Sequence, residues 1–537
     1  MSAGFRLLDA DRVGFQVAWE SRPDFVAPIT AQEFQRLPER FRASIRQRYI
    51  TLRNRQGDYA ANVWLRESVT APVAAIGFGG YVRSRDDEAI RHEADTRAHA
   101  MRRLLVDVTP DTYGRAAKLA EWHKVTPPQP GRAGRTLEGA ARRLCDALWW
   151  RRQIRSRDGR VIETLARTLN LVNQQVRECY ASAEAVERRR SQKTRNRAIL
   201  GTLQAESSTG DVLPLLQIVE HSVSTPAIRR AELMTRIHGM EDWATEQGMQ
   251  SEFVTATCPS AYHRAHAKSG REVSNWNGTT PREAQAYLAK CWARVRAAWQ
   301  RAGIDGCGLR IAEPHHDGTP HWHLLIFWPE GQAEAGFEIL AREFERADHY
   351  EVKPGVRVKR IPIDRERGSA AGYVAKYVCK NIDGAHIEKD LLGNPAVDTA
   401  ERVDAWASVW GIRQFQFFGT APVGVWRELR RLDAGQAGAI EPARECADAG
   451  NYHGYLRHMR AAPITLYKAE PDGVTPLGEW RGFNRYGEAL HQIIIGVTDG
   501  LYWACSRIKT WLISFSSSVA SATAWTRVNN CTEENAL

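Results

Sequence analysis

Hydrophobic and polar positions in the middle of the chain follow a pattern that predicts two neighbouring β-strands. Leu309–Glu313 and His321–Trp328 are apolar runs rich in strand-forming residues, and the polar segment between them contains Asp317-Gly318-Thr319-Pro320. Asp-Gly followed by Pro is typical of the turn that joins two paired strands. We therefore expect these runs to form an antiparallel hairpin.

The hairpin presents two histidines to one point in space. Side chains alternate between the two faces of a strand, so His321 and His323 are predicted to share a face while Trp322 points away. Glu313, on the facing strand, is expected to reach the same point and to supply an oxygen ligand to a metal ion.

The ligand set has alternatives. His315 and His316 are possible replacements for Glu313, because the register of the hairpin is not set by the sequence. Two histidines at this spacing also occur without a metal, and in cupin-type metal sites. In a cupin an acidic residue follows within a few positions, whereas the next one here, Glu330, lies beyond the apolar run and Pro329.

A helix that carries two tyrosines is predicted about fifty residues downstream. Ser369–Asn381 has an N-capping serine and apolar residues at helical spacing, and it ends in Asn381 and Gly384. Tyr373 and Tyr377 are four positions apart and therefore share a helix face, as do Lys376 and Lys380 on the adjoining face. Such a tyrosine pair is more often part of a core stripe than of an active site.

Together, the histidine strand and the tyrosine helix favour one chemistry, in which a metal ion polarises a phosphodiester and a tyrosine attacks it. A free phenol has a pKa of about 10 and is mostly protonated at neutral pH. The metal and a lysine, for which Lys376 is the candidate, would have to lower the barrier. Lys376 is equally suited to contact DNA.

The remaining patterns predict an alternation of helices and strands around this pair. Arg357, Lys359 and Arg360 lie on one predicted strand and, with Lys380, are candidate DNA contacts. The other predicted elements are a helix over Met240–Gln247, a strand over Phe253–Thr257, a helix from Thr280-Pro281 to Arg301 capped by Gly303, a helix over Ala333–Ala347, a strand over Val356–Ile361, a strand-like Trp410–Phe418, a helix over Val423–Leu432, a helix over Glu441–Met459 and a loosely ordered Ser514–Ala524.

Composition places the 537-residue chain among globular proteins with two to four domains. Its apolar content is 43%, and the longest candidate membrane span, Ile493–Leu512, is interrupted by Asp499, Arg507 and Lys509. The first residues lack a secretion signal, and nine cysteines without a CxxC pair do not indicate a disulfide framework. We expect a cytoplasmic protein without a membrane partner.

The net charge of +11 suggests a polyanionic partner, and part of it is concentrated in one region. Residues 142–200 interleave arginines with Trp149-Trp150, a pattern that suits nucleic-acid binding and equally suits surface arginines on helices with buried tryptophans. We expect residues 1–205 to form a helix-rich basic region, a candidate for binding DNA or a partner, and Glu206–Asp211 to be a linker.

The chain resembles the HUH single-strand endonucleases and, more closely, the two-tyrosine replication gene A proteins of tailed bacteriophages. The resemblance covers most of the chain from about residue 230 onward. Its motifs are Phe253–Ser260 with Tyr262-His263, Glu313-Pro314-His315 through Pro320–His323, Tyr373–Val378 through Lys380–Asp383, Arg413–Gly419 with Val425–Leu429, and Trp525–Thr532.

The resemblance implies an α+β fold whose HUH core, an antiparallel sheet flanked by helices, spans residues 231–385 and is followed by a mixed region of unknown role over 400–537. It implies that His321, His323 and Glu313 bind Mg²⁺ or Mn²⁺. It also implies that Tyr373 and Tyr377 nick single-stranded or unwound origin DNA through a 5′-phosphotyrosine intermediate, in rolling-circle replication with a host helicase and DNA polymerase.

Two observations refine this expectation. The chain has no GxxxxGK[ST] phosphate loop, so no nucleotide cofactor is expected. Two alternatives remain, a two-tyrosine HUH transposase and a non-catalytic basic DNA-binding protein. The resemblance after residue 410 favours the phage initiator over the transposase.

Overall fold

A computed structural model describes residues 37, 39–70, 87–176, 178–346, 355–364, 366, 368–385, 388, 395–469, 483–489, 493–507, 509 and 511–516. The chain divides into two compact units. The first comprises the described parts of Met1–Arg188 with Arg264–Ser274 and Arg485–Glu488, and the second comprises the rest. Within the described ranges, no helix combines the length and the apolar character that crossing a membrane requires.

The first unit is helical, as the sequence predicts for this region. Two apolar clusters form its core, one between α2 and α7 and one around Trp150, which is fully buried. Its elements are α2 (Glu39–Leu65), the π-helix η1 (Arg66–Thr70), α4 (Asp87–Leu104), α5 (Pro110–Trp122), the short 3₁₀ helix η3 (Arg132–Gly134), α6 (Leu137–Leu144), α7 (Ala147–Thr168) and the start of α8 (Ala183–Gly201).

Three arginines and both tryptophans of residues 142–155 have structural partners inside this unit. Trp149 and Trp150 are core residues of α7. Arg151 and Arg155 both form ion pairs with Asp87 at the start of α4. Arg143 binds Glu488 through two hydrogen bonds of 2.6 and 2.8 Å. For these residues the structure therefore favours buried tryptophans with ion-paired arginines over a nucleic-acid surface.

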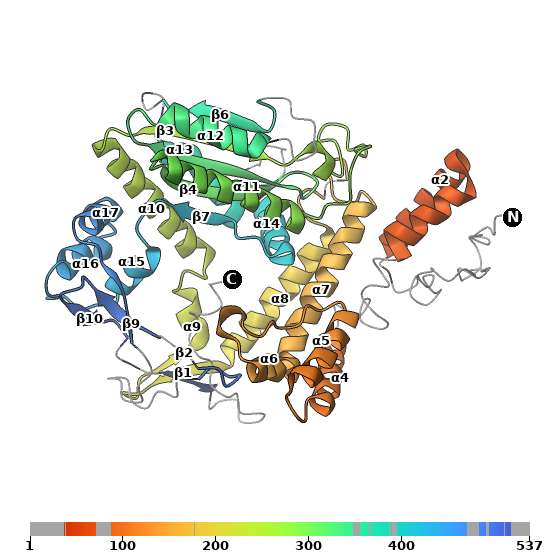
Figure 1. The fold of residues 1–537 in the computed structure, drawn as a ribbon, viewed down its shortest axis with the longest axis horizontal. Coiled ribbons are helices and arrows are strands. Elements are labelled where there is room, and N and C mark those ends of the chain that lie inside the picture. Colours follow the sequence, from red (N-terminus) through yellow and green to blue (C-terminus); the bar gives the residue numbers. More distant parts are fainter. Residues whose placement is uncertain are drawn as a thin grey trace. The chain divides into compact units, whose positions relative to one another are not determined.

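A five-stranded antiparallel sheet organises the second unit, with the strand order β6-β3-β5-β4-β7 (Figure 1). The predicted hairpin is its centre, where β4 pairs with β5 and Glu313 lies opposite His321. Strand bounds are β3 (Gln250–Thr257), β4 (Cys307–Pro314), β5 (Pro320–Trp328), β6 (Val358–Pro362) and β7 (Phe415–Phe418).

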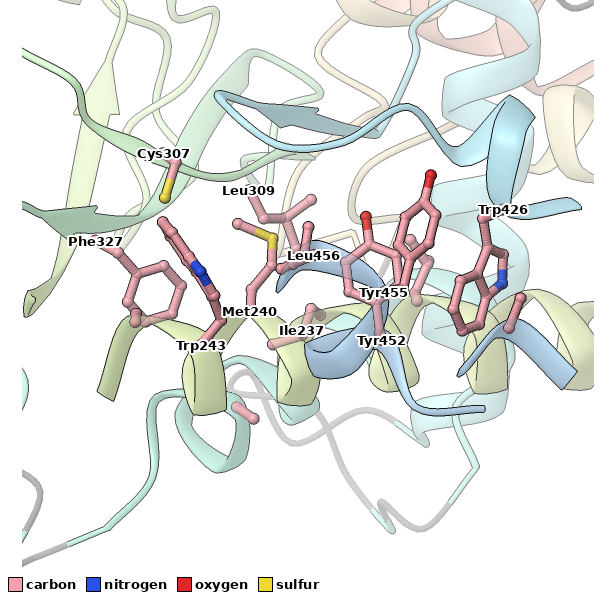
Figure 2. Close-up of a cluster of buried hydrophobic side chains, with 14 of the residues drawn as sticks. Ile237, Met240, Trp243, Cys307, Leu309, Phe327, Trp426, Tyr452, Tyr455 and Leu456 are labelled. Atoms are coloured by element: carbon pink, nitrogen blue, oxygen red, sulfur yellow. The ribbon is translucent and has the colours of Figure 1, made fainter. Parts of the chain in front are cut away.

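Helices cover both faces of this sheet. On one face, Leu309 and Phe327 pack against Ile237, Met240 and other residues of α10 (Pro226–Glu246) and against α13 (Ala370–Ile382) (Figure 2). On the opposite face, Trp328 contacts Trp299 of α11 (Pro281–Ala302) with ring centroids 5.0 Å apart, and Phe344 of α12 (Ala333–Glu345) contacts Trp322. Layers on both faces explain why all of β4 is buried.

Capping residues set the helix boundaries where the sequence predicts them. Thr280 and Glu283 form a reciprocal capping box at the start of α11, and Gly303 ends the helix in the left-handed conformation with φ 66°. Ser369 caps α13 by accepting a hydrogen bond from the Gly372 amide. The tyrosine helix therefore begins one residue after its predicted cap.

Two smaller three-stranded sheets and several helices complete this unit. The sheets have the orders β10-β9-β8 and β11-β1-β2. The elements are β1 (Leu203–Ser207), β2 (Val212–Pro214), α9 (Leu215–Glu220), the 3₁₀ helix η4 (Ser260–Tyr262), α14 (Ala396–Trp410), α15 (Val423–Leu429), α16 (Ile440–Asp448), α17 (Tyr452–Ala461), β8 (Thr465–Ala469), β9 (Ile493–Thr498), β10 (Trp503–Cys505) and β11 (Trp511–Phe515).

Several predictions outside the central sheet are wrong. Glu206–Asp211 is a hairpin between β1 and β2 instead of a linker, because Ser207 and Asp211 bond across the turn and Gly210 adopts φ 88°. Trp410 ends α14 instead of entering a strand, since Gly411 caps that helix with φ 66°. The predicted helix over Glu441–Met459 is two helices.

The break between these two helices falls at Gly450 and Asn451, where Gly450 has φ 70° and Asn451 caps α17. Ser514 belongs to β11 and is therefore not loosely ordered. The rest of the Ser514–Ala524 prediction from residue 517 onward, together with the motif at Trp525–Thr532, lies outside the described residues.

Candidate metal and nucleophile site

The predicted ligand residues converge at one end of the central hairpin. His321 and His323 project from the same face of β5, with their Nε2 atoms 2.9 Å apart. One carboxylate oxygen of Glu313 lies 3.6 Å from Nε2 of His323 and 3.9 Å from Nε2 of His321. One ligand atom from each of the three residues lies within 4.8 Å of the others, so two imidazoles and one carboxylate offer a donor set that fits a divalent cation.

The environment of His321 suits metal binding, which requires a neutral imidazole. Burial, and then the neighbouring imidazoles of His315 and His323, hold the pKa of His321 well below its ordinary value. Thr255 on β3 lies 3.0 Å from Nδ1 of His323. A proton on that nitrogen, donated to the threonine hydroxyl, would leave the lone pair of Nε2 available to a cation beside Glu313.

Glu313 is ionised although it is almost completely buried. Burial opposes its ionisation, but the charge of Lys380 and the contacts with His323 and Asn381 outweigh it and lower the pKa of Glu313 to about 2. Nζ of Lys380 lies 3.3 Å from one carboxylate oxygen, and the Asn381 amide donates to the other. Both residues come from the last turn of the tyrosine helix, so α13 holds the acidic ligand in place.

The two tyrosines lie beside this cluster. The ring of Tyr377 is 4.5 Å from that of His323 and is stacked on Phe253 at 5.1 Å. Tyr373 lies one turn earlier, and the two phenol rings are 6.3 Å apart. Tyr377 is buried whereas Tyr373 is partly exposed. The histidine strand and the tyrosine helix, fifty residues apart in sequence, therefore meet as predicted.

Lys376 places a positive charge next to both phenols. Its Nζ lies 4.8 Å from the ring centroid of Tyr373 and 5.0 Å from that of Tyr377. Burial, and then the neighbouring Tyr373 and Glu313, raise the pKa of the Tyr377 hydroxyl above its ordinary value. The hydroxyl of Tyr377 therefore keeps its proton at neutral pH, and forming its phenolate requires additional positive charge.

The alternative third ligands lie next to the cluster. The ring of His315 lies 4.1 Å from that of His321 and 4.9 Å from that of His263. Burial, and then His263, lower the pKa of His315 to about 3. His316 is buried, but it does not belong to the group of ligand atoms. The geometry favours Glu313.

The predicted DNA contacts do not form one basic groove. Arg360 is hydrogen-bonded to Glu252 and Glu334, and Lys380 is paired with Glu313. Arg357 is 5% exposed and donates to the Tyr287 hydroxyl at 2.7 Å. Only Lys359 of the four is exposed.

Sequence reasoning assigned no role in the site to Thr255, Asn381 or His263. His263 and Thr255 lie in the first motif and Asn381 lies in the third, so motif membership was the signal available for them. Their roles follow from the antiparallel register, in which Thr255 lies opposite His323, and from the distance between α13 and β4.

Comparison with known proteins identifies the family. The family described as bacteriophage replication gene A protein (GPA) matches residues 87–385, so the similarity begins well before residue 230. The replication gene A protein of Escherichia phage 186 is 39% identical over 450 residues, which cover 78% of this chain and 64% of the phage protein.

Other relatives carry related names. The replication protein of Haemophilus phage HP1 is 33% identical over 441 residues, 77% of this chain and 56% of its own length. A probable replication endonuclease from a prophage-like region of Salmonella typhimurium is 33% identical over 422 residues, 73% and 51% of the two chains. The chain thus spans about half to two thirds of these relatives, and no solved structure matches it. With more than half of its length matched, this chain belongs to the bacteriophage replication gene A protein family.

Proposed function

We propose that this protein is a metal-dependent, site-specific single-strand DNA endonuclease and strand-joining enzyme of the two-tyrosine HUH type, which initiates rolling-circle replication of phage DNA in the bacterial cytoplasm. One observation carries the proposal. The ring of Tyr377 lies 4.5 Å from that of His323, so a candidate nucleophile lies beside a buried Glu-His-His ligand set. Relatives named as probable replication endonucleases support a nuclease, and the antiparallel sheet with helices on both faces supports the HUH type.

Glu313, His321 and His323 would hold the cation, for which Mg²⁺ and Mn²⁺ are the candidates. A divalent ion bound there supplies positive charge that polarises the scissile phosphate. The surrounding residues prepare the ligands for this role. Thr255 orients the ring of His323, while Asn381 and Lys380 stabilise the negative charge of Glu313.

The covalent step conserves the number of phosphoester bonds. The phenolic oxygen of one tyrosine attacks phosphorus and forms a 5′-phosphotyrosine, while the bond from phosphorus to the 3′-oxygen breaks. The phenol loses its proton to solvent, and the 3′-oxygen takes one up and leaves as a hydroxyl that a host polymerase can extend. Since no bond energy is lost, no nucleotide is consumed, and unwinding is left to a host helicase.

The second tyrosine allows the reaction to end in the same site. Tyr373 and Tyr377 lie on one helix face with Lys376 against both rings. After one round of synthesis, the free tyrosine attacks the regenerated origin. The 3′-hydroxyl released by this cut then attacks the first phosphotyrosine and restores a closed strand. Lys376 stabilises the developing phenolate in each direction.

A cleavage assay tests the proposal. Purified protein is mixed with Mg²⁺ or Mn²⁺ and a labelled pool of single-stranded oligonucleotides that includes phage origin sequences, and the products are separated under denaturing conditions. The expected result is a metal-dependent adduct at the 5′-end. It should survive Tyr373→Phe or Tyr377→Phe alone and disappear in the double variant and in His321→Ala.

A variant outside the ligand set provides the matched control. Glu330→Gln removes an exposed acidic residue that follows β5 and is expected to leave adduct formation unchanged. Absence of an adduct with every metal, in protein that still binds DNA, would contradict the proposal and leave a non-catalytic DNA-binding protein.

A further inference from the structure

Arg310 is a buried cation without a counter-charge among the described residues. It lies on β4, but alternation along the strand directs its side chain to the face opposite Glu313, where its guanidinium lies 4.1 Å from the ring centroid of Trp322. The residue is 6% exposed, and its Nε has no hydrogen-bond partner. In the described part of the chain, no carboxylate pairs with it.

Among the described residues, Arg236 and Arg357 are also buried without a carboxylate partner, and each lies over an aromatic ring. Several other arginines are ion-paired. Arg360, on the same sheet, is bonded to two carboxylates, and Arg143 in the first unit binds Glu488 through two hydrogen bonds. A buried guanidinium normally requires a paired anion, because removing its hydration shell is costly. Contact with the face of Trp322 compensates for only part of that cost.

Two further arginines lie around Arg310. In the sheet, Arg310 of β4 lies opposite Gln416 of β7. Nε of Arg413 donates a hydrogen bond of 3.2 Å to the carbonyl of Phe415, the residue that precedes Gln416. Arg296 lies one turn after Trp292 on α11, and Trp292 contacts Phe418 of β7 at 4.9 Å. The three arginines therefore come from adjoining elements: Arg310 from β4, Arg413 from the segment before β7, which pairs with β4, and Arg296 from α11, which contacts β7.

Electrostatics agrees with this placement. Burial, and then the positive charges of Arg413 and Arg296, lower the pKa of Arg310 to about 10. Arg296 and Arg413 are exposed, so an anion can approach the buried guanidinium from their side. Among the described residues, no carboxylate forms an ion pair with either of them.

We infer that Arg296, Arg310 and Arg413 form a binding site for backbone phosphates of single-stranded DNA, on the sheet face opposite the tyrosines. DNA phosphates suit this site because guanidinium groups bind phosphate through paired hydrogen bonds. A DNA strand also presents its phosphates in series, which matches arginines on three elements. The inference rests on the proposed function for the identity of this ligand. It adds a contact that would hold the strand away from the scissile bond.

The test measures binding of a long single-stranded oligonucleotide by fluorescence anisotropy over a range of salt concentrations. Arg310→Met and the double change Arg296→Gln with Arg413→Gln are expected to weaken binding by about 10-fold. They should also reduce the slope of log affinity against log salt by about 0.7 for each phosphate that the variant no longer binds. Arg301→Gln removes an exposed arginine of the same helix and should change neither quantity.

Stability provides an independent readout. Without DNA, Arg310→Met should raise the melting temperature, because it replaces an uncompensated buried charge with an apolar chain of similar length. If Arg310→Met does not fold, DNA binding by the double variant Arg296→Gln with Arg413→Gln tests the inference, since that variant alters only exposed side chains. If the double variant binds DNA with the affinity and the salt slope of the wild type, the inference is overturned.

The same variants separate this inference from the proposed function. Adduct formation on a short oligonucleotide that covers only the scissile bond should be retained in Arg310→Met. A reduced salt slope in a protein that forms no adduct would support the arginine site and contradict the nuclease. Unchanged DNA binding, with loss of binding to an acidic peptide, would assign the arginines to a protein partner and overturn the inference.

Discussion

At the scale of single residues, the amide of Asn381 connects the acidic ligand to the tyrosine helix. It donates to the Glu313 carboxylate and to the Tyr377 carbonyl, and the residue is 2% exposed. Replacing Asn381 with alanine removes a hydrogen bond that orients the ligand. We expect Mn²⁺ affinity, measured by isothermal titration calorimetry, to fall by about 10- to 100-fold. Unchanged affinity would contradict the prediction that this hydrogen bond orients Glu313 for metal binding.

Lys376 is expected to act on the reaction rate. Lys376→Met removes the charge next to both phenols and should slow adduct formation at saturating DNA by about 100-fold, whereas Lys376→Arg should retain most of the rate. Single-turnover kinetics at saturating DNA measures the rate of adduct formation in both variants. A variant with a normal rate at saturation and weaker DNA binding would instead identify Lys376 as a DNA contact.

Sequence reasoning predicted the parts of this site that depend on local periodicity. Alternation along one strand places His321 with His323, and helical spacing places Tyr373 with Tyr377. The partnership of Lys380 and Asn381 with Glu313 depends on how closely α13 approaches β4, which no local pattern contains. Lys380 was accordingly predicted as a DNA contact, whereas in the structure it neutralises a buried carboxylate.

At the scale of elements, the start of the tyrosine helix is fixed from two sides. Ser369 caps it, and the Glu241 carboxylate of α10 accepts from the Ala370 and Ala371 amides. Ser369→Ala should lower the free energy of unfolding by about 1 kcal/mol and should also slow adduct formation, because Tyr373 lies in the first turns.

The other capped helix supplies the control for this prediction. Thr280→Ala removes a cap of the same kind from α11 and should cost about as much stability, near 1 kcal/mol, without a change in rate. Chemical denaturation and the cleavage assay are compared for both variants. Equal effects on rate would show that the loss reflects general destabilisation.

His123, which follows the last residue of α5, is expected to make stability depend on pH. Burial, and then Arg97 and Arg157, lower the pKa of His123 to about 4 from an ordinary 6.5. Between these values the unfolded chain binds more protons than the folded one, so stability falls as pH decreases from about 6.5 to about 4. His123→Gln should reduce this fall, measured as melting temperature at pH 7 and pH 5. An identical pH dependence in both proteins would contradict the assignment.

Element boundaries could be predicted where a capping residue marks them. Thr280, Gly303 and Ser369 are such markers, and the helices begin and end there. The hairpin at Glu206–Asp211 could not be predicted, because the polar residues of a turn resemble those of a linker. Its strand β1 also pairs with β11, about three hundred residues away in the sequence.

At the scale of the whole molecule, net positive charge overstates the charge available to DNA. Three basic residues of α8 form ion pairs with two acidic residues of α14. Arg189 and Lys193 pair with Asp404, and Arg190 pairs with Glu401. Changing Arg190 and Lys193 to alanine should alter the free energy of unfolding by less than about 1 kcal/mol. Affinity for single-stranded DNA should stay within about twofold at constant salt, and a large loss would show that α8 binds DNA.

The position of β7 in the central sheet determines which part of the chain can fold by itself. The strand pairs with β4 from Gly308 to Ile311, yet it lies thirty residues beyond the matched range that ends at residue 385. A polypeptide cut at that point would keep both tyrosines and every candidate metal ligand. It would also expose unpaired amides and carbonyls along β4 and lose Phe415 from the apolar core, and such open edges promote aggregation. The smallest autonomous folding unit is therefore larger than the set of residues that the chemistry requires.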